Sequence, residues 1–394
     1  MKCYEAVRGK QGFDATAVTD TIKRALASAG LDTAAGPLKQ VTATIEDALS
    51  AAGLMPRNAA ASPATTFDGT AREVDAEEAL VIESADAAPA IVEPTTTETP
   101  KPQPGEFLER SFTSSLGTRA YKVYVPAGYP VRSGDPMPLV VMLHGCTQDP
   151  DDFAAGTRMN ALADEHGFIA VYPAQSATAN AQKCWNWFRP GDQVRDRGEP
   201  AIIAGITSEV ASTYRIDPRR IFVAGMSAGA AMAVILATTY PDIYAAVAVH
   251  SGLAYGAAHD VPSAFRAMRA ENISASSPPR APITVPAIVF HGDNDRTVNA
   301  GNADAIVRHC IAEQADSALH EEASRGTAVG GRRFSRKVYA DARNAVIAEH
   351  WVVHGAGHAW SGGSAAGTFT DAGGPDASKE MIRFFLNLPR AGTS

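Results

Sequence analysis

From about residue 107 onward, the chain alternates short apolar runs with segments in which apolar residues recur at helical spacing. The runs 108–114 and 121–125 alternate apolar and polar residues, which predicts an antiparallel pair of strands. Later runs are apolar throughout, as expected of parallel strands buried on both faces: 139–143, 168–172, 221–224, 245–249, 287–290 and 350–353. This pattern predicts an α/β fold with a mostly parallel central sheet, helices on both faces and an antiparallel start.

The first 54 residues have a different pattern. Between 14 and 54, apolar residues fall at helical spacing in two stretches that end at Gly30 and Gly53. The stretches are also alike in sequence, since residues 19–26 align with residues 42–49. Two copies are too few for a solenoid, so residues 1–54 are expected to form a helical segment, a hairpin that is either inert or an interaction module.

Residues 55–105 are rich in Ala, Pro, Thr and Glu. The part from 92 to 105 holds four prolines and four threonines but only one strongly apolar residue. Such a segment cannot bury enough apolar surface to offset the entropy lost on ordering, which predicts a disordered or extended linker. The remaining residues, 106–394, form the expected large domain.

The formal net charge of −8 is concentrated in the linker, because residues 68–100 contain nine acidic residues and one Arg. Acidic and basic residues balance in the rest of the chain. A neutral body excludes nucleic acid as a partner, since phosphate binding needs a basic face. No apolar stretch approaches the roughly 20 residues that span a bilayer. No secretory signal is visible near the N-terminus, which favours a cytoplasmic protein.

Residues 225–229 (GMSAG) follow an apolar strand and precede the helical stretch 230–239. This strand, GxSxG turn and helix are typical of a nucleophile elbow. The turn is so tight that the positions two before and two after the serine must lack bulky side chains. The hydroxyl of Ser227 then stands clear of the backbone, and Ser227 is the candidate nucleophile. The N–H of Ala228, the next residue, is expected to point at the reacting oxygen.

A second backbone donor for that oxygen is expected at residues 144–146 (HGC), which end the strand 138–143. The N–H of Cys146 is the candidate, so the predicted oxyanion hole consists of the N–H groups of Cys146 and Ala228. His144 is expected to pack under this loop as a structural residue.

Candidates for the acid and the base follow two later strands. Asp293 and Asp295 both follow the strand 287–290, and Asp295 lies further into the loop, as a residue that turns back toward a histidine needs to. We therefore expect Asp295 to orient the base and Asp293 to cap the loop. His358 follows the last strand after small residues, and we expect it to be the base rather than His354. The chain order Ser, Asp, His is that of the α/β-hydrolases.

With these residues assigned, residues 107–388 resemble the catalytic domain of the poly(3-hydroxybutyrate) depolymerase family of esterases. That family has the α/β-hydrolase fold and is related to the feruloyl and acetylxylan esterases. The resemblance rests on six segments: 143–148 (LHGCTQ), 184–188 (CWNWF), 225–229 (GMSAG), 250–252 (HSG), 291–295 (HGDND) and 357–363 (GHAWSGG).

The resemblance implies the same catalytic residues, Ser227, Asp295 and His358, and no metal or organic cofactor. It implies an ester or polyester substrate, with poly(3-hydroxybutyrate) or its oligomers leading and feruloyl or acetyl esters of plant polysaccharide as the alternative. Members are often extracellular, unlike the expectation above. Residues 14–54 are then a candidate module for docking on a polymer granule or a protein partner.

Two tryptophans in the CWNWF segment, Trp185 and Trp187, offer flat apolar area for a substrate's acyl chain or aromatic group, or else pack the loop. From the matching segments, Gln148 and Trp360 join them as expected substrate-binding residues.

The four cysteines allow three full pairings and their spacing resembles no zinc site, so four unpaired thiols are one reading. Cys146 follows the oxyanion glycine, and Cys184 precedes the two tryptophans. The family resemblance falls on both residues and favours a disulfide between them. In a cytoplasmic enzyme both would stay reduced.

Overall fold

A computed structural model of the protein describes residues 105–129, 135–271, 281–312 and 319–389. The expected helical segment 1–54 and all but the last residue of the expected linker 55–105 lie outside the described residues.

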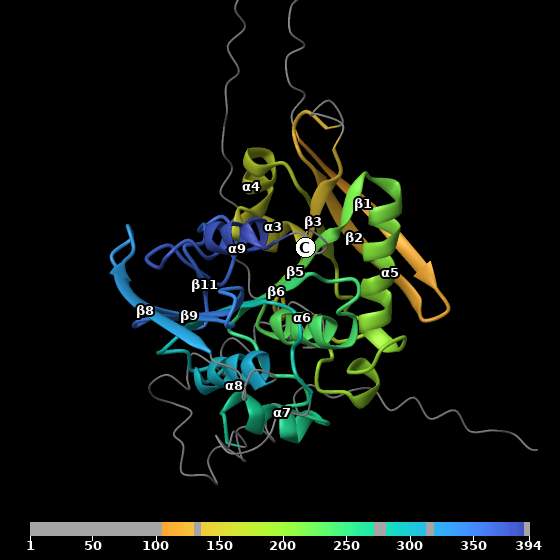
Figure 1. The fold of residues 1–394 in the computed structure, drawn as a ribbon. Helices are drawn as coiled ribbons and strands as arrows, with labels where there is room; N and C mark the ends of the chain where they lie inside the picture. The colour runs from red at the N-terminus through yellow and green to blue at the C-terminus, as the bar shows by residue number, and fades with distance from the viewer. Residues whose placement is uncertain (1–104, 130–134, 272–280, 313–318, 390–394) are drawn as a thin grey trace, which may run out of the picture. The chain divides into compact units, whose positions relative to one another are not determined.

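The described residues form one ten-stranded sheet in the order β1-β2-β4-β3-β5-β6-β7-β10-β9-β8 (Figure 1). Neighbouring strands from β4 to β10 run parallel, whereas the pairs at both edges are antiparallel. The strands are β1 (Glu106–Ser114), β2 (Gly117–Val125), β3 (Met137–Leu143), β4 (Ile169–Pro173), β5 (Ile216–Met226), β6 (Ala246–His250), β7 (Ala287–Gly292), β8 (His320–Thr327), β9 (Arg333–Ala340) and β10 (Val346–Val353). A separate short pair joins β11 (Trp360–Ser361) to β12 (Thr370–Asp371).

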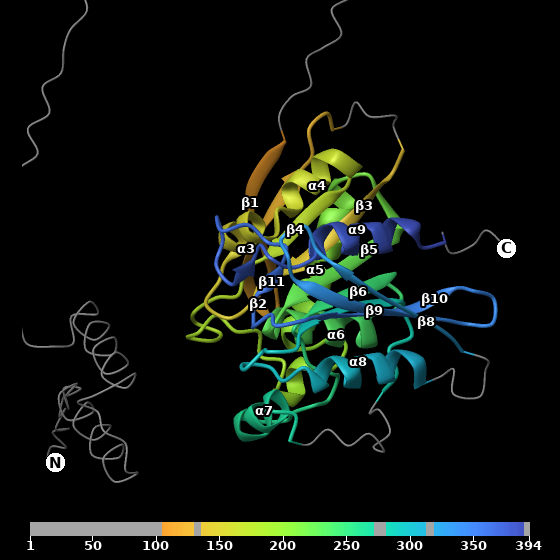
Figure 2. The same cartoon turned by 90° about the vertical axis from the view of Figure 1, so that its left-hand side faces the viewer.

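Helices cover both faces of the sheet because successive strand residues point to opposite sides. Leu139, Val141 and Leu143 of β3 pack in one apolar cluster with α5, α6 and α8, while Val140 and Met142 pack in the other with α3, α4 and α9. Figure 2 shows α8 and α9 on opposite sides of the strands. The helices are α3 (Pro150–Thr157), α4 (Met159–His166), η1 (Pro190–Asp192), α5 (Gly198–Thr213), α6 (Ala228–Thr239), α7 (Val261–Met268), α8 (Gly301–Ile311) and α9 (Ala377–Asn387).

The predicted mostly parallel sheet, its antiparallel start and its helices on both faces are confirmed. Every predicted strand is present, but two further strands of the large sheet, β8 and β9, were not predicted, nor was the short pair of β11 and β12. Strands β8 and β9 are both polar, and β8 is exposed along nearly its whole length, so neither has the apolar run or the alternation that identifies a strand. Within the described ranges, no helix is long and apolar enough to cross a membrane.

Candidate active site

The turn between β5 and α6 holds Ser227 in a conformation that few side chains adopt. Its φ of 56° and ψ of −120° lie outside the regions that suit most residues, and its N–H donates to the carbonyl of His250 at 2.9 Å. The glycines two residues before and two residues after Ser227 are required because there is no space for a side chain at either position. A Cβ at Gly225 would lie 2.4 Å from the carbonyl carbon of Gly229, and one at Gly229 would lie 2.1 Å from the carbonyl oxygen of Leu143. The sequence therefore folds into the predicted elbow.

His358 and Asp295 meet in the loops that follow the neighbouring parallel strands β10 and β7. Nδ1 of His358 lies 2.7 Å from Oδ2 of Asp295. A carboxylate only accepts hydrogen bonds, so Nδ1 carries the hydrogen and Nε2 keeps a lone pair with which to take a proton. The other carboxylate oxygen accepts the N–H groups of Thr297 and Val298, both at 2.9 Å.

Asp295 is buried, with 8% of its surface exposed, and it remains ionised. Burial raises the pKa of its carboxyl, but hydrogen bonds from His291 and His358 outweigh burial and hold the pKa far below its usual range. His291 is the weaker partner of the two. Its Nε2 lies 3.4 Å from Oδ2 of Asp295 but 2.8 Å from the carbonyl of Val298, which is its main acceptor. The carboxylate is thus a fixed negative charge beside His358.

His250, at the end of β6, connects the serine turn with the histidine loop. Its carbonyl accepts the N–H of Ser227, and its Nε2 accepts the N–H of Ser361 at 3.0 Å. Burial, and then the nearby His291 and His358, lower the pKa of His250 to about 3. Its ring stays neutral and stacks on Trp360 at 5.0 Å. Residues from the ends of β5, β6, β7 and β10 therefore gather at the carboxyl edge of the sheet.

The loop after β3 approaches the same serine. A Cβ built on Gly145 would lie 3.7 Å from Cβ of Ser227. The N–H of Gly145 is bound by Oε1 of Gln148 at 2.9 Å, that of Thr147 by the carbonyl of Gln182, and that of Gln148 by the carbonyl of Gly145.

Two N–H groups near Ser227 are therefore without a protein acceptor among the described residues. Among residues 145–148 of the loop after β3, the N–H of Cys146 is the one left without such an acceptor. Ala228 is the first residue of α6, so its N–H has no partner within the helix. Both belong to the predicted oxyanion hole.

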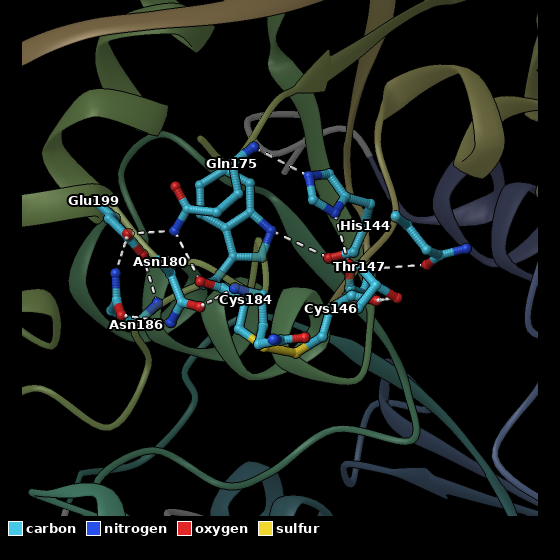
Figure 3. Close-up of a disulfide and its surroundings, with 12 residues drawn as sticks. His144, Cys146, Thr147, Gln175, Asn180, Cys184, Asn186 and Glu199 are labelled. Atoms are coloured by element: carbon cyan, nitrogen blue, oxygen red, sulfur yellow. Dashed lines mark hydrogen bonds between the residues drawn. A yellow bond between two sulfur atoms is a disulfide. The ribbon is translucent and has the colours of Figure 1, made fainter. Parts of the chain in front are cut away.

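The loop after β3 is anchored to the segment that follows β4. A disulfide joins Cys146 to Cys184 (Figure 3). Next to it in the chain, the indole N–H of Trp185 donates to the carbonyl of His144 at 3.1 Å, and Nε2 of His144 accepts the N–H of Gln175 at 3.1 Å. Burial lowers the pKa of His144 to about 4, so this histidine is neutral and structural, as expected.

Glu199, in the first turn of α5, holds the other side of this disulfide, and sequence reasoning missed it. Its carboxylate accepts the N–H and the side-chain amide of Asn186 at 2.7 and 2.6 Å, and the side-chain amide of Gln175 at 2.5 Å. The same amide of Gln175 donates to the carbonyl of Cys184 at 2.9 Å (Figure 3). Burial raises the pKa of Glu199 despite these bonds. A buried acid of this kind leaves no signal in the sequence, since its partners are 13 and 24 positions away.

The structure corrects part of the predicted substrate-binding set. Trp185 is fully buried and Trp360 is 1% exposed, with its indole N–H on the hydroxyl of Ser378. Neither has surface left for a substrate, because both pack under the loops. Gln148 is also buried and binds Gly145, Asp152 and Thr368. Of the four residues, Trp187 is the most exposed, at 7%.

A mostly parallel sheet with a serine on the strand–helix turn, and with a histidine and an aspartate after later strands, defines the α/β-hydrolase fold. A model of the family Esterase PHB depolymerase matches residues 119–317, and the chain belongs to this family.

Curated relatives agree with this assignment. The chain is 33% identical over 267 residues to poly(3-hydroxyalkanoate) depolymerase C of Paucimonas lemoignei, which covers 63% of this chain and 60% of the relative. It is 35% identical over 130 residues to feruloyl esterase B of Thermothelomyces thermophilus, covering 32% of the chain and 43% of the relative. The chain thus spans at most about 60% of the length of the first curated relatives.

Among solved structures, the acetyl xylan esterase from Aspergillus awamori superposes with a TM-score of 0.52 at 18% identity, covering 71% of this chain and 98% of that chain. At this identity the likeness supports the fold alone.

Proposed function

We propose that the chain hydrolyses carboxylic esters through an acyl-enzyme, with Ser227 as nucleophile, His358 as general base and Asp295 as the residue that orients the base. The observation that carries the proposal is the 2.7 Å contact between His358 Nδ1 and Asp295 Oδ2, in loops at the same edge of the sheet at which Ser227 occupies the tight turn between β5 and α6. Membership of the Esterase PHB depolymerase family supports it independently.

The steps follow from these groups. Nε2 of His358 takes the hydroxyl proton of Ser227 while the serine oxygen attacks the ester carbonyl. The negative charge that develops on the carbonyl oxygen is stabilised by the N–H groups of Cys146 and Ala228. His358 then gives its proton to the leaving alcohol. Water attacks the acyl-enzyme by the same route and releases the acid.

For the substrate, we propose poly(3-hydroxybutyrate) or its short oligomers, supported by the relative named as a polyhydroxyalkanoate depolymerase. Feruloyl or acetyl esters of plant polysaccharide are the second candidate, because relatives named as feruloyl and acetylxylan esterases match shorter parts of the chain. The test compares initial rates on hydroxybutyrate oligomers, methyl ferulate and acetylated xylan at equal enzyme concentration, with Ser227→Ala as the blank. A higher kcat/KM on either plant ester would reverse the order of these candidates.

A separate proposal concerns residues 14–54, for which the two similar helical patterns suggest a module that docks the enzyme on a polymer granule or a protein. The segment should be fused to a fluorescent reporter and mixed with polymer granules. Retention above that of the reporter alone supports docking. Equal retention excludes docking on granules.

A further inference from the structure

A second group of three hydrogen-bonded residues lies outside the proposed catalytic residues. Nδ1 of His354 lies 2.8 Å from Oδ2 of Asp293, and Nε2 of His354 lies 2.8 Å from the hydroxyl oxygen of Ser335 on β9. The other oxygen of Asp293 accepts the N–H of Gly355 at 2.6 Å. Asp293 and His354 are each partly exposed, at 41% and 35% of the side chain.

In this group of three residues, every hydrogen-bond donor faces an acceptor. The carboxylate of Asp293 accepts at both oxygens, so Nδ1 of His354 carries the hydrogen and Nε2 accepts the hydroxyl of Ser335. Burial opposes ionisation of Asp293, but the hydrogen bonds from His354 and Gly355 outweigh it and lower the pKa of the carboxyl. Only a carboxylate satisfies both donors at once, since an amide at this position would offer a single acceptor oxygen.

The group sits between the two loops that carry Asp295 and His358. The N–H of Asp293 donates to the carbonyl of Val353 at 3.2 Å, and that of Asn294 donates to the carbonyl of Ala356 at 3.0 Å. The loops touch so closely that a Cβ at Gly292 would lie 2.3 Å from the carbonyl oxygen of Ala356.

Strand β9 and the turn before it hold the far side of the histidine loop. Nη1 of Arg332 donates to the carbonyl of Gly355 at 2.9 Å, and the N–H of His354 donates to the carbonyl of Arg333 at 2.9 Å. The residues just before His358 are therefore fixed from two sides, by the loop after β7 and by β9.

The hydrogen bonds link a serine to a histidine and the histidine to an aspartate, as in the catalytic residues of a serine hydrolase. The surroundings of Ser335, however, do not suit a nucleophile. Ser335 lies within β9 and is paired with Val352 of β10 on one side and Arg325 of β8 on the other. In a strand paired on both sides the backbone N–H groups bond to the neighbouring strands, so they cannot hold an oxyanion. No tight turn presents this serine, in contrast to Ser227.

We propose that Asp293 and His354 are positioning residues for the base. By fixing the backbone of residues 353–356 against the loop that carries Asp295, they keep His358 at hydrogen-bond distance from Asp295. The inference rests on the proposed function and deepens it. Because alignment of the base matters most in the transition state, losing the clamp lowers kcat and leaves KM nearly unchanged.

The test compares variants that remove the hydrogen bonds with variants that keep them. His354→Ala removes both bonds, whereas His354→Asn puts an amide N–H where Nδ1–H stands and keeps the bond to Asp293. His354→Gln reaches the Nε2 position and keeps only the contact with Ser335. The control is His259→Ala, because His259 also lies near an acid, 3.7 Å from Asp260, and its side chain is 67% exposed just before α7.

We expect His354→Ala, His354→Gln and Asp293→Ala to lower kcat on a soluble ester about 10- to 100-fold, with KM within about twofold of wild type. His354→Asn should retain most of the activity, and His259→Ala all of it. The labelling rate of Ser227 with a fluorophosphonate should fall in parallel with kcat. In the proton NMR spectrum, the downfield Nδ1–H signal of His358 should broaden or shift in the impaired variants.

If the two residues are merely structural, the variants will have a lower thermal midpoint but an unchanged kcat when folded. That result overturns the proposal. If His354→Ala does not fold, equal kcat values for His354→Asn and His354→Gln overturn it as well. Labelling of Ser335 that depends on His354 identifies a second nucleophile and also overturns it. Failure of the proposed function is distinct, because the wild-type enzyme would then neither hydrolyse esters nor become labelled at Ser227.

Discussion

The carboxylate of Asp295 accepts the Nδ1–H of His358 at 2.7 Å, while its second oxygen is held by the backbone N–H groups of Thr297 and Val298. The carboxylate cannot rotate freely, since those two bonds fix which oxygen faces the histidine. The acid therefore determines the tautomer of the base as well as its orientation.

Asp295→Asn should abolish most activity because the backbone N–H groups keep the amide oxygen and turn the amide NH2 toward His358. Nδ1 of His358 must then accept a hydrogen bond from the amide, so the ring hydrogen moves to Nε2. Nε2 then has no lone pair with which to take the serine proton. We expect kcat to fall by roughly 10⁴-fold, as for the corresponding change in a serine protease. Asp293→Asn should cost far less. Both are measured as kcat on a soluble ester at pH 7, and equal losses would contradict the assignment of Asp295.

Ser227→Ala and Ser227→Gly should both lose ester hydrolysis, by about a million-fold if Ser227 is the nucleophile. Their stabilities should differ. At φ 56° and ψ −120°, a side chain is strained, whereas glycine adopts this conformation freely. The free energy of unfolding of Ser227→Gly should therefore exceed that of Ser227→Ala by about 1 kcal/mol, so the glycine variant should unfold at a higher urea concentration. An alanine variant with residual activity above about a thousandth of wild type would exclude Ser227 as nucleophile.

The free energy of unfolding should fall as the pH drops from 7 to 5. Burial lowers the pKa of His144 to about 4 and, with the nearby His291 and His358, that of His250 to about 3. In the unfolded chain an imidazole binds a proton near pH 6.5. Below that pH the unfolded state therefore binds protons that these buried imidazoles do not bind in the folded state, and stability falls. Each histidine should cost about 2 kcal/mol of stability between pH 7 and pH 5.

The loss of stability between pH 7 and pH 5 that the buried histidines cause can be separated from the titration of acids. The lowered pKa of Asp295 adds stability that is lost only below about pH 4, where unfolded carboxyls take up protons. Urea unfolding at pH 7 and pH 5 should show a smaller difference for His144→Gln, whose amide oxygen still accepts the N–H of Gln175. The exposed His259→Gln is the control. A wild-type stability that is flat from pH 7 to 5 would contradict burial of neutral imidazoles.

Removing residues 1–105 should leave kcat and KM on a soluble ester within about twofold, because few contacts are expected to cross a linker of this composition. The described residues by themselves form a buried apolar cluster on each face of the sheet, which is consistent with independent folding. Circular dichroism and kcat of the truncated protein are the measurements. Loss of folding would show that the N-terminal segment packs on the catalytic domain and that the predicted boundary is wrong.

How far the sequence predicts this molecule depends on whether a feature is local. Strands such as β3 and β7 are apolar runs, and their ends locate Cys146 and Asp295 at one edge of the sheet by the rule for parallel strands. Strands β8 and β9 escaped prediction because both are polar, and β8 is also exposed along nearly its whole length. They matter to the site, since the turn before β9 and Ser335 within it hold the histidine loop.

Side-chain roles that depend on distant partners were harder to predict. Trp185 looked like a substrate contact because an indole offers flat apolar area, and Trp360 because of the matching segments, yet the fold uses both side chains for packing. Gln148 is a similar case, since its amide holds Gly145 and the loop around Thr368 instead of a substrate. Whether a side chain is buried depends on which helices, strands and loops pack against it, and a single sequence does not reveal that.

The disulfide between Cys146 and Cys184 ties the proposed oxyanion donor to a segment that Glu199 holds through Gln175 and Asn186 (Figure 3). An oxyanion donor acts mainly in the transition state and must be held still to be effective. Cys184→Ser should therefore lower kcat by about tenfold or more while raising KM much less, since losing the donor entirely costs roughly 100- to 1000-fold.

The double variant Cys146→Ser/Cys184→Ser should be no worse than the single variant, because either substitution breaks the same bond and the effects are not additive. Cys310→Ala is the matched control, since its thiol is buried away from the loop and burial raises the pKa of that thiol to about 12. The bond is first verified in wild type by peptide mapping under non-reducing conditions, after free thiols are trapped. Wild-type enzyme reduced with dithiothreitol should then reproduce the kcat of Cys184→Ser. If kcat stays unchanged once mapping shows both thiols free, the hydrogen bonds around Glu199 and Gln148 hold the donor without the disulfide.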